Sequence, residues 1–477
     1  MDGRQPGASE GSHGHRESEG RLSDPPVLPA SAPSGGEPGE SGPAGGAPAG
    51  LGPGGPFAVF VRGSLPAWAL VRQRFDPDEI DDVRGAVRAA LEPVMGTIRP
   101  GMRVCIAAGS RGIDRIDQVI RATVERLAEA GASVFIIPAM GSHGGATAEG
   151  QREVLAGYGI TPQAMGCEIR ASMATVALGE VRPGVPVHLD REAFEGADAI
   201  IPVNRVKVHT DFSGPVQSGL AKMIAIGLGK QQGADTFHRE GFAVFHALIP
   251  EVAAFTLTHA PIPFGLALVE NGFARLRHVE AVPAGRIASR EPELLAMSTD
   301  LLARLPLDAL DVLILDEIGK DVSGLGMDSN VVGRYYTGPT GAGPAVQRIV
   351  ARGLTAATEG NAVGVGMADV VLRRLVDAID TAKTYMNCVT AKTPEGARVA
   401  LTVDTDREAL AIALACCLRV TPETARIVRA PDTKHLEWLY VSEPALPEVL
   451  AGGRCELVEP PHPIAFDAHG MLTEQYR

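Results

Sequence analysis

The order of apolar and polar segments limits the fold of this chain more than any other feature. Residues 103–108 form a short apolar run that ends at glycine, and residues 114–130 carry apolar side chains at helical spacing. The same order then repeats, with an apolar run at 133–138, a glycine-rich loop and a helical stretch at 147–156. Strand, polar loop and helix in alternation are typical of βαβ units with a parallel sheet, so the sequence predicts an α/β fold. Further strands of this form are expected at 197–203 and 264–269.

A second unit of the same kind follows. Residues 311–315 predict a strand that runs into a polar loop, and residues 361–367 and 368–381 predict a further strand and a helix. A strand, a polar loop and a helix in this order again indicate a sheet that is covered by helices. We therefore expect two α/β domains with parallel-type sheets, at 56–290 and 300–477.

The segment 1–55 differs in composition from the rest of the chain. It consists mainly of Gly, Pro, Ser and Ala with scattered charges. Such a segment cannot bury enough apolar surface to offset its own ordering entropy. We therefore expect a disordered N-terminal tail at 1–55.

Charge and hydropathy exclude several classes of protein. The chain has 44 Lys and Arg against 57 Asp and Glu, a formal net charge of −13, and no basic stripe, which argues against nucleic acid as the main partner. We see no apolar run of the roughly 18–20 residues that a membrane span needs. The N-terminus has no apolar core of a secretory signal, and the six cysteines lack CxxC spacing. These observations predict a cytoplasmic protein with reduced cysteines and no membrane partner.

Three histidines stand in polar or glycine-rich surroundings next to expected strand ends. They are His143 in GSHGGAT, His209 in KVHTDFSG and His238 in DTFHREGF. Any one of them alone is better explained by a hydrogen-bonded or surface role. Together they favour a site, because open α/β sheets bind ligands beyond the carboxyl ends of their strands, and imidazole suits proton transfer near neutral pH. The chain has no HExxH or paired-cysteine spacing, so no zinc site is indicated.

Cationic side chains in the same loops suggest an anionic ligand. Lys222 lies in a run of small and apolar residues, where a charge needs an anionic partner such as a carboxylate or phosphate. Arg111, just past a strand end, invites the same interpretation, whereas Lys230 is expected to be solvated. Glu317 and Lys320, three residues apart, could pair with each other or contact a ligand.

The glycines after His143 allow two interpretations. Gly144 and Gly145 can simply turn the chain between strand and helix. Alternatively, they let the backbone approach a phosphate at the N-terminus of the next helix. The loop has neither a Walker lysine nor a GxGxxG pattern, so both interpretations stay open.

Three motifs resemble the nickel-dependent lactate racemase family, over about residues 104–330. They are GSHGGATAEGQ after a strand, KVHTDFSGPVQSGLAKM, and the downstream His238. The resemblance implies a racemase or epimerase of a 2-hydroxy acid that transfers hydride reversibly to a nickel-pincer nucleotide, Ni(II) pyridinium-3,5-bisthiocarboxylic acid mononucleotide. It also implies that the parallel-type sheets of the two α/β domains face a cleft, and that the enzymes that make this cofactor load it into the protein. It does not fix the oligomeric state.

The resemblance assigns roles to individual residues. His143 and His209 match the two catalytic histidines, and His238 matches the nickel ligand. Cofactor binding is implied for Lys222, Lys207, Gly144 and Gly145, and substrate binding for Arg111, Glu317 and Lys320.

The chain departs from the lactate-acting members at three places. Gly109-Ser110-Arg111-Gly112-Ile113 replaces their D-x-T-R-P loop, the spacing from His209 to Lys222 is longer, and Glu317 replaces an amide. These departures suggest the same cofactor class with a different substrate or a looser hold on the cofactor. The alternatives are a sugar-acid epimerase on the same fold, and a nucleotide- or carboxylate-binding homologue without racemase activity.

Overall fold

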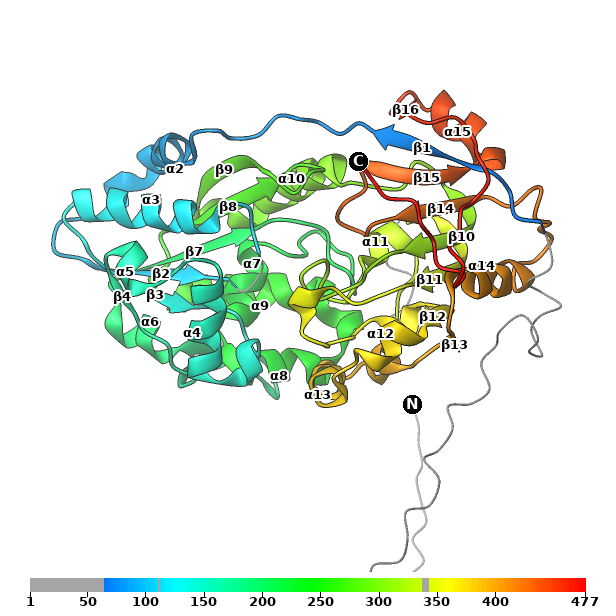
Figure 1. Ribbon diagram of the computed structural model, residues 1–477. Helices are drawn as coiled ribbons and strands as arrows, with labels where there is room; N and C mark the ends of the chain where they lie inside the picture. Colours follow the sequence, from blue (N-terminus) through cyan, green and yellow to red (C-terminus); the bar gives the residue numbers. More distant parts are fainter. Residues whose placement is uncertain (1–63, 110–111, 337–342) are drawn as a thin grey trace, which may run out of the picture. The chain divides into compact units, whose positions relative to one another are not determined.

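Two β-sheets, each covered by helices on both faces, form the framework of the computed structural model (Figure 1). The structure describes residues 64–109, 112–336 and 343–477, so the expected tail at 1–55 and Arg111 lie outside the described residues. Both sheets lie within residues 64–477.

The first sheet is parallel except at one edge. Its order is β4-β3-β2-β7-β8-β9, and only β9 runs antiparallel to its neighbour. Its strands are β2 (Arg103–Ala108), β3 (Ser133–Pro138), β4 (Glu168–Ile169), β7 (Ala199–Arg205), β8 (Phe264–Glu270) and β9 (Leu276–Pro283). A separate hairpin consists of β5 (Thr175–Arg182) and β6 (Val185–Asp190).

The second sheet has eight strands in the order β13-β12-β11-β10-β14-β15-β1-β16. The strands from β13 to β14 are parallel, and β15, β1 and β16 are antiparallel to their neighbours. The bounds are β1 (Trp68–Gln73), β10 (Ala309–Leu315), β11 (Ala345–Ala351), β12 (Val370–Leu372), β13 (Leu401–Val403), β14 (Ile427–Ala430), β15 (Trp438–Ser442) and β16 (Cys455–Leu457). The predicted α/β class with mostly parallel sheets is therefore confirmed.

The helices pack on the sheets through alternating side chains of the strands. In β2, Val104 and Ile106 join one core, which includes α3, and Cys105 and Ala107 join the other, which includes α9. The helices along the first sheet are α2 (Val83–Leu91), α3 (Ile116–Glu129), α4 (Ala148–Gly157), α5 (Pro162–Met165), α6 (Arg191–Gly196), α7 (Leu220–Lys222), α8 (Lys230–Glu240), α9 (Phe245–His259) and α10 (Ile287–Leu301). Those along the second are α11 (Ser329–Val332), α12 (Arg373–Asp377), α13 (Thr381–Ala391), α14 (Asp406–Ala415) and α15 (Leu446–Ala451).

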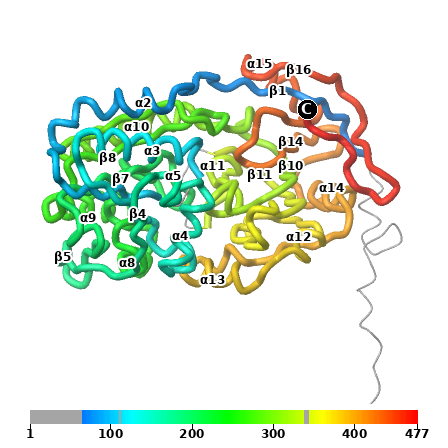
Figure 2. The backbone as a smooth tube through the Cα atoms, turned by 60° about the vertical axis from the view of Figure 1, so that its left-hand side comes forward, coloured from blue at the N-terminus to red at the C-terminus, as the bar shows by residue number. Residues whose placement is uncertain are grey.

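The N-terminal strand β1 belongs to the second sheet. Both views show β1 next to β16, and β1 pairs with β15 on its other side (Figures 1 and 2). Among the described strands, β1 thus belongs to the second sheet, the following strands of the chain form the first sheet and the hairpin, and β10–β16 complete the second sheet. The division into domains at 56–290 and 300–477 stays a prediction.

One expectation for the second unit is wrong. Residues 361–367 form turns and a 3₁₀ segment, Val365–Met367, and the region 368–381 holds β12 and α12 before α13 begins at Thr381. Gly364 has φ +101°, and a Cβ on it would lie 1.6 Å from the carbonyl oxygen of Leu325. This close approach forces a turn where the apolar pattern predicted a strand.

One helical segment meets the length and composition of a membrane span, which the sequence interpretation overlooked. It covers Phe242–His259, with a mean hydropathy of 1.3 over 18 residues. Within it, Phe245, Leu248, Ile249 and Val252 lie in the core against the first sheet. Core packing therefore accounts for its apolar character, and a single helix of this kind is weak support for a membrane location.

Candidate functional site

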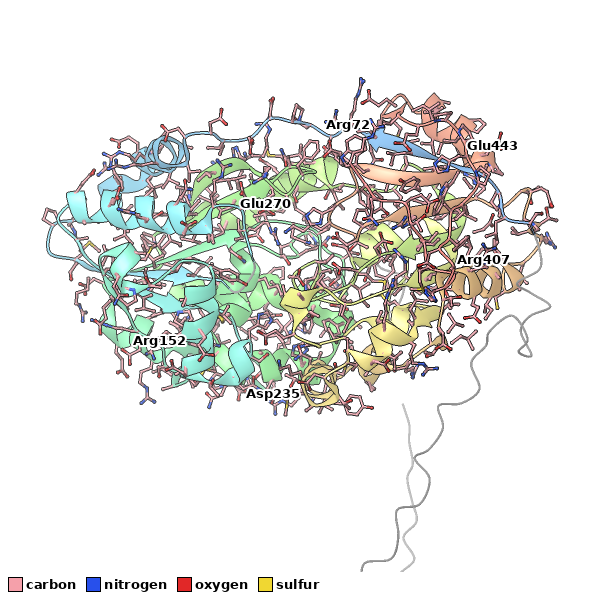
Figure 3. All side chains as sticks on the ribbon, in the orientation of Figure 1. Arg72, Arg152, Asp235, Glu270, Arg407 and Glu443 are labelled. Carbon is pink, nitrogen blue, oxygen red and sulfur yellow. The ribbon has the colours of Figure 1, made fainter. Side chains whose placement is uncertain are left out.

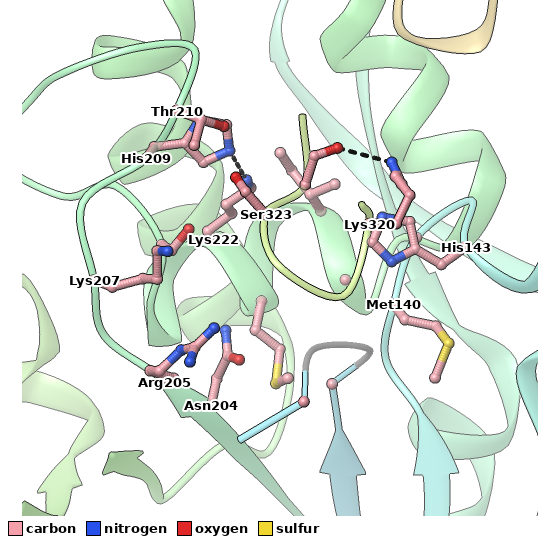
Figure 4. A pocket seen from close by; sticks show the side chains of 18 of the residues that line it. Met140, His143, Asn204, Arg205, Lys207, His209, Thr210, Lys222, Lys320 and Ser323 are labelled. Carbon is pink, nitrogen blue, oxygen red and sulfur yellow. Dashed lines mark hydrogen bonds between the residues drawn. The ribbon is translucent and has the colours of Figure 1, made fainter. Parts of the chain in front are cut away.

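The carboxyl ends of β2, β3 and β7 open on one cavity of about 390 Å³ (Figure 4). Ligands bind at this end of the strands in open α/β sheets. The first sheet contributes Gly109, Gly112, Met140, Gly141, His143 and the stretch 204–210, except Val206, and the following helix contributes Lys222 and Met223. The second half of the chain contributes residues 320–324 and Lys434.

His209 and Lys222 are in direct contact in this cavity. Nε2 of His209 is hydrogen-bonded to Nζ of Lys222, as the dashed line in Figure 4 marks. Nδ1 accepts the backbone N–H of Asp211 at 3.0 Å, and the ring packs on Phe212 at 4.3 Å between centroids. Both ring nitrogens and one ring face are therefore held by named groups, which fixes the orientation of the imidazole.

Lys222 is carried by a short helix whose start is held by a buried carboxyl group. Glu291 of α10 is 1 % exposed and accepts the backbone N–H of Ala221 at 2.8 Å. Burial raises the pKa of Glu291 to about 7, against the opposing effect of its bonds to the backbone. A Cβ on Gly219 would lie 2.2 Å from Oε1 of Glu291, so glycine permits this approach.

His143 lines the same cavity from the loop after β3. Its backbone N–H donates to the carbonyl of Met140 at 3.2 Å. Gly144 and Gly145 are not among the described residues that line the cavity. Gly144 has φ +65°, and a Cβ there would lie 2.5 Å from the backbone of Gly150, so close packing on α4 requires this glycine.

Several cationic side chains line the cavity. Lys207 forms an ion pair with Asp328 at 3.3 Å, and burial lowers the pKa of Lys207 while the charge of Asp328 opposes that shift. Lys320 donates to the carbonyl of Gly324 at 2.8 Å. The cationic lining residues are Arg205, Lys207, Lys222, Lys320 and Lys434. A cavity with this lining is suited to carboxylate or phosphate groups.

Arg205 is fixed by a buried acid on the neighbouring strand. It forms an ion pair with Glu270, which Figure 3 labels and whose side chain is 8 % exposed. Glu270 also accepts the backbone N–H of Asp114 at 2.7 Å. This pair holds the end of β7 against the end of β8.

His238 lies outside the set of residues that line the cavity. It sits on α8 against Phe242 and Phe245, at 5.5 and 5.8 Å between ring centroids. Burial first, and then the charge of Lys222, lower the pKa of His238 to about 4. Its Nδ1 is buried and has no hydrogen-bond partner among the described residues.

Neutral imidazole with a free nitrogen is the form that binds a metal. The described part of the chain holds no cluster of three His, Cys, Asp or Glu side chains suited to a metal ion. The buried, neutral imidazole of His238 fits the role of a metal ligand, and nickel accepts imidazole readily.

The structure separates Glu317 from Lys320. Glu317 lines a different cavity, of about 430 Å³, together with Arg352, Arg374 and Asp432. Burial, aided by the nearby carboxylates, raises the pKa of Glu317. The structure thus brings His143, His209, Lys207, Lys222 and Lys320 into one cavity, but not Glu317 or His238.

The sequence interpretation missed several lining residues. Asn204 and Arg205 directly follow the apolar core of β7, so their place at a strand end was a usable signal. Lys434 precedes the antiparallel strand β15, and no pattern in the sequence marks it. Lys230, expected to be solvated, is 0 % exposed, so that expectation is wrong.

Comparisons with known proteins agree with the motifs. Residues 70–246 match the family model described as the lactate racemase N-terminal domain. Residues 70–246 are therefore identified as a lactate racemase N-terminal domain, which agrees with the family that the motifs predict. No curated protein matches the chain. Among solved structures, the lactate racemase apoprotein from Thermoanaerobacterium thermosaccharolyticum is similar, with 15% identity, coverage of 78% of this chain and 94% of that chain, and a TM-score of 0.44.

Proposed function

We propose that the chain is a racemase or epimerase of a 2-hydroxy acid that uses a nickel-pincer nucleotide as a reversible hydride acceptor. The observation that carries this proposal is the convergence of His143 and His209 on one cationic cavity. The two histidines come from loops after β3 and β7, the strands on either side of β2. Two imidazoles from separate loops can exchange a proton with the substrate hydroxyl group on either face of the reacting carbon.

The chemistry requires both an electron sink and acid–base groups. The Cα proton of an unactivated hydroxy acid is too weakly acidic for side chains alone, so a bound cofactor must accept the hydride. The histidines handle the proton on the hydroxyl oxygen, as general base in one direction and general acid in the other. In His209, Nδ1 accepts the Asp211 N–H, so the neutral ring carries its proton on Nε2, next to Lys222. Accepting the substrate proton at Nε2 therefore requires that the bond to Asp211 be released.

The remaining side chains suit binding roles. Lys207, Lys320 and Lys434 can hold the substrate carboxylate and the cofactor phosphate by charge-assisted hydrogen bonds. His238 would supply one imidazole nitrogen to the nickel. The proposal includes loading by cofactor-synthesis enzymes and a cytoplasmic location, with which the six unpaired cysteines are compatible.

The test is expression together with the cofactor-making enzymes, followed by nickel analysis and a panel of 2-hydroxy acids and sugar acids. We expect stoichiometric nickel and racemisation or epimerisation of one substrate class. His143→Ala and His209→Ala should abolish turnover and keep the nickel, and His238→Ala should lose the nickel. His278→Ala is the matched control, because His278 lies on β9 and does not line the cavity.

Two outcomes would refute the proposal. One is protein that stays free of nickel and inactive on the whole panel. The other is a parent chain that shows no turnover and whose ligand binding persists in both His143→Ala and His238→Ala. This result would indicate a binding homologue without racemase activity. In deuterated water, return of the substrate's own hydrogen leaves Cα free of deuterium, whereas exchange with solvent would exclude internal hydride return.

A further inference from the structure

Three polar side chains from three separate elements meet inside the first half of the molecule. Asp190 ends β6, Lys230 begins α8 and Gln151 lies on α4, and each is 0 % exposed. Nζ of Lys230 lies 2.8 Å from a carboxylate oxygen of Asp190 and donates to Oε1 of Gln151 at 3.2 Å. The three groups form one buried network.

This network ends on the loop that carries His143. The amide nitrogen of Gln151 donates to the carbonyl of Gly141 at 2.8 Å and to that of His143 itself at 3.3 Å. Nζ of Lys230 donates to the carbonyl of Pro138, the last residue of β3, at 2.5 Å. The loop from 138 to 143 is thus bound at three carbonyl groups by two buried side chains.

The arrangement is costly for the fold. Removing a lysine and a carboxylate from water carries a desolvation penalty that their attraction repays only partly. Lys230 also has φ +53°, a backbone conformation that non-glycine residues adopt rarely and at a cost. A residue that only began α8 would need neither the buried charge nor the strained backbone.

We propose that Gln151 is a positioning residue for His143, and that the Lys230–Asp190 ion pair holds Gln151 in its orientation. Since Oε1 of Gln151 accepts from Lys230, its amide nitrogen is directed at the loop carbonyls. The role of His143 in proton transfer rests on the proposed function. The positioning itself is a property of the loop and can be measured without turnover.

The test uses two variants of the full chain and a matched control. Gln151→Met keeps the length of the side chain but removes the donors to the loop. Gln151→Glu, studied at pH 8, keeps acceptor oxygens for Lys230 but offers the loop no N–H. Gln73→Met is the control, because Gln73, on β1 of the second sheet, is also buried, at 2 % exposed. Its amide likewise donates to two carbonyl groups, those of Arg304 and Leu436.

The first readout is hydrogen exchange of the peptide that covers residues 139–147, with carbethoxylation of His143 measured on the same samples. Loss of a buried hydrogen bond is worth about 1–1.5 kcal/mol, so exchange in this peptide should rise about five- to tenfold in both Gln151 variants. His143 should become modified faster in both. In Gln73→Met, exchange should rise in the second sheet while the 139–147 peptide and His143 stay unchanged.

The second readout is kinetic, with the hydroxy acid that the substrate panel identifies. A misplaced acid–base group lowers the rate of the chemical step, so kcat should fall at least about tenfold while KM changes less than about twofold. Unchanged exchange at 139–147 in both Gln151 variants would overturn the proposal, as would a Gln151→Glu variant that behaves like the parent chain. If the parent chain shows no turnover, the proposed function fails, and the exchange and modification data still decide the positioning.

Discussion

Replacing Glu291 by glutamine should stabilise the protein at alkaline pH and leave it unchanged at acid pH. Glu291 is 1 % exposed, and no positively charged group opposes the effect of its burial, which raises its pKa to about 7. The amide of glutamine has the same shape and an oxygen that can still accept the N–H of Ala221, which Glu291 accepts at 2.8 Å. The variant therefore removes the ionisation of the carboxyl group at position 291 and keeps the hydrogen bond to the backbone N–H of Ala221.

The sign and size of the effect follow from proton binding. In the unfolded chain a glutamate titrates near its ordinary value of 4.5, whereas in the native state Glu291 holds its proton up to a pH of about 7. Between these values the native state binds more protons, so the free energy of unfolding falls as pH rises. At about 1.4 kcal/mol per pKa unit, the loss approaches roughly 3 kcal/mol and is complete above pH 7. Glutamine carries no charge at any pH and escapes this loss.

The measurement is urea unfolding of the parent chain and Glu291→Gln at intervals between pH 4.5 and 8.5. The difference in unfolding free energy should be near zero at the acid end and grow to about 2–3 kcal/mol in favour of the variant above pH 7. Glu293→Gln is the control, because Glu293 lies on the same helix with a side chain 61% exposed. A difference that is flat with pH, or a variant less stable than the parent at pH 8, would refute the reasoning.

Two further substitutions test the packing around the site. Gly219→Ala places a Cβ 2.2 Å from Oε1 of Glu291 and should lower the unfolding free energy by about 1–3 kcal/mol, as measured by thermal melts. Gly285→Ala is the control, because its Cβ would meet open space and should have little effect. A Gly219→Ala variant as stable as the parent would contradict the close approach. Lys230→Met leaves Asp190 buried without its cation and should cost about 3–5 kcal/mol, and adding Asp190→Leu should recover the part that comes from the unpaired carboxylate, as urea unfolding would show. A double variant no more stable than Lys230→Met would contradict this reasoning.

Local patterns predicted the first sheet well because its strands are short apolar runs that end at polar loops. Observed β2 and β3 have the expected bounds, and the loops after β3 and β7 bring His143 and His209 to one cavity. The strand-end rule is general for open α/β sheets, so this part of the site could be inferred without contacts.

The errors share one cause, which is that the deciding partner lies far away in the sequence. Lys230 is buried because it meets Asp190 and Gln151, and no local pattern identifies either as its partner. The turn at Gly364 depends on the close carbonyl of Leu325. Glu317 and Lys320 are neighbours in the sequence, yet the loop directs them into different cavities, because spacing alone does not say which way a loop residue faces.

The place of β1 in the second sheet has a consequence for the order of folding. Residues 68–73 are synthesised before the first sheet, but the strands that flank them, at 438–442 and 455–457, leave the ribosome only after the whole first sheet. The first sheet can form while synthesis continues, since its strands all lie between residues 103 and 283. Pairing over such a long stretch of chain is slow and leaves strand edges open meanwhile. We therefore expect β1 to be the last strand to find its place, although it is the first to be made.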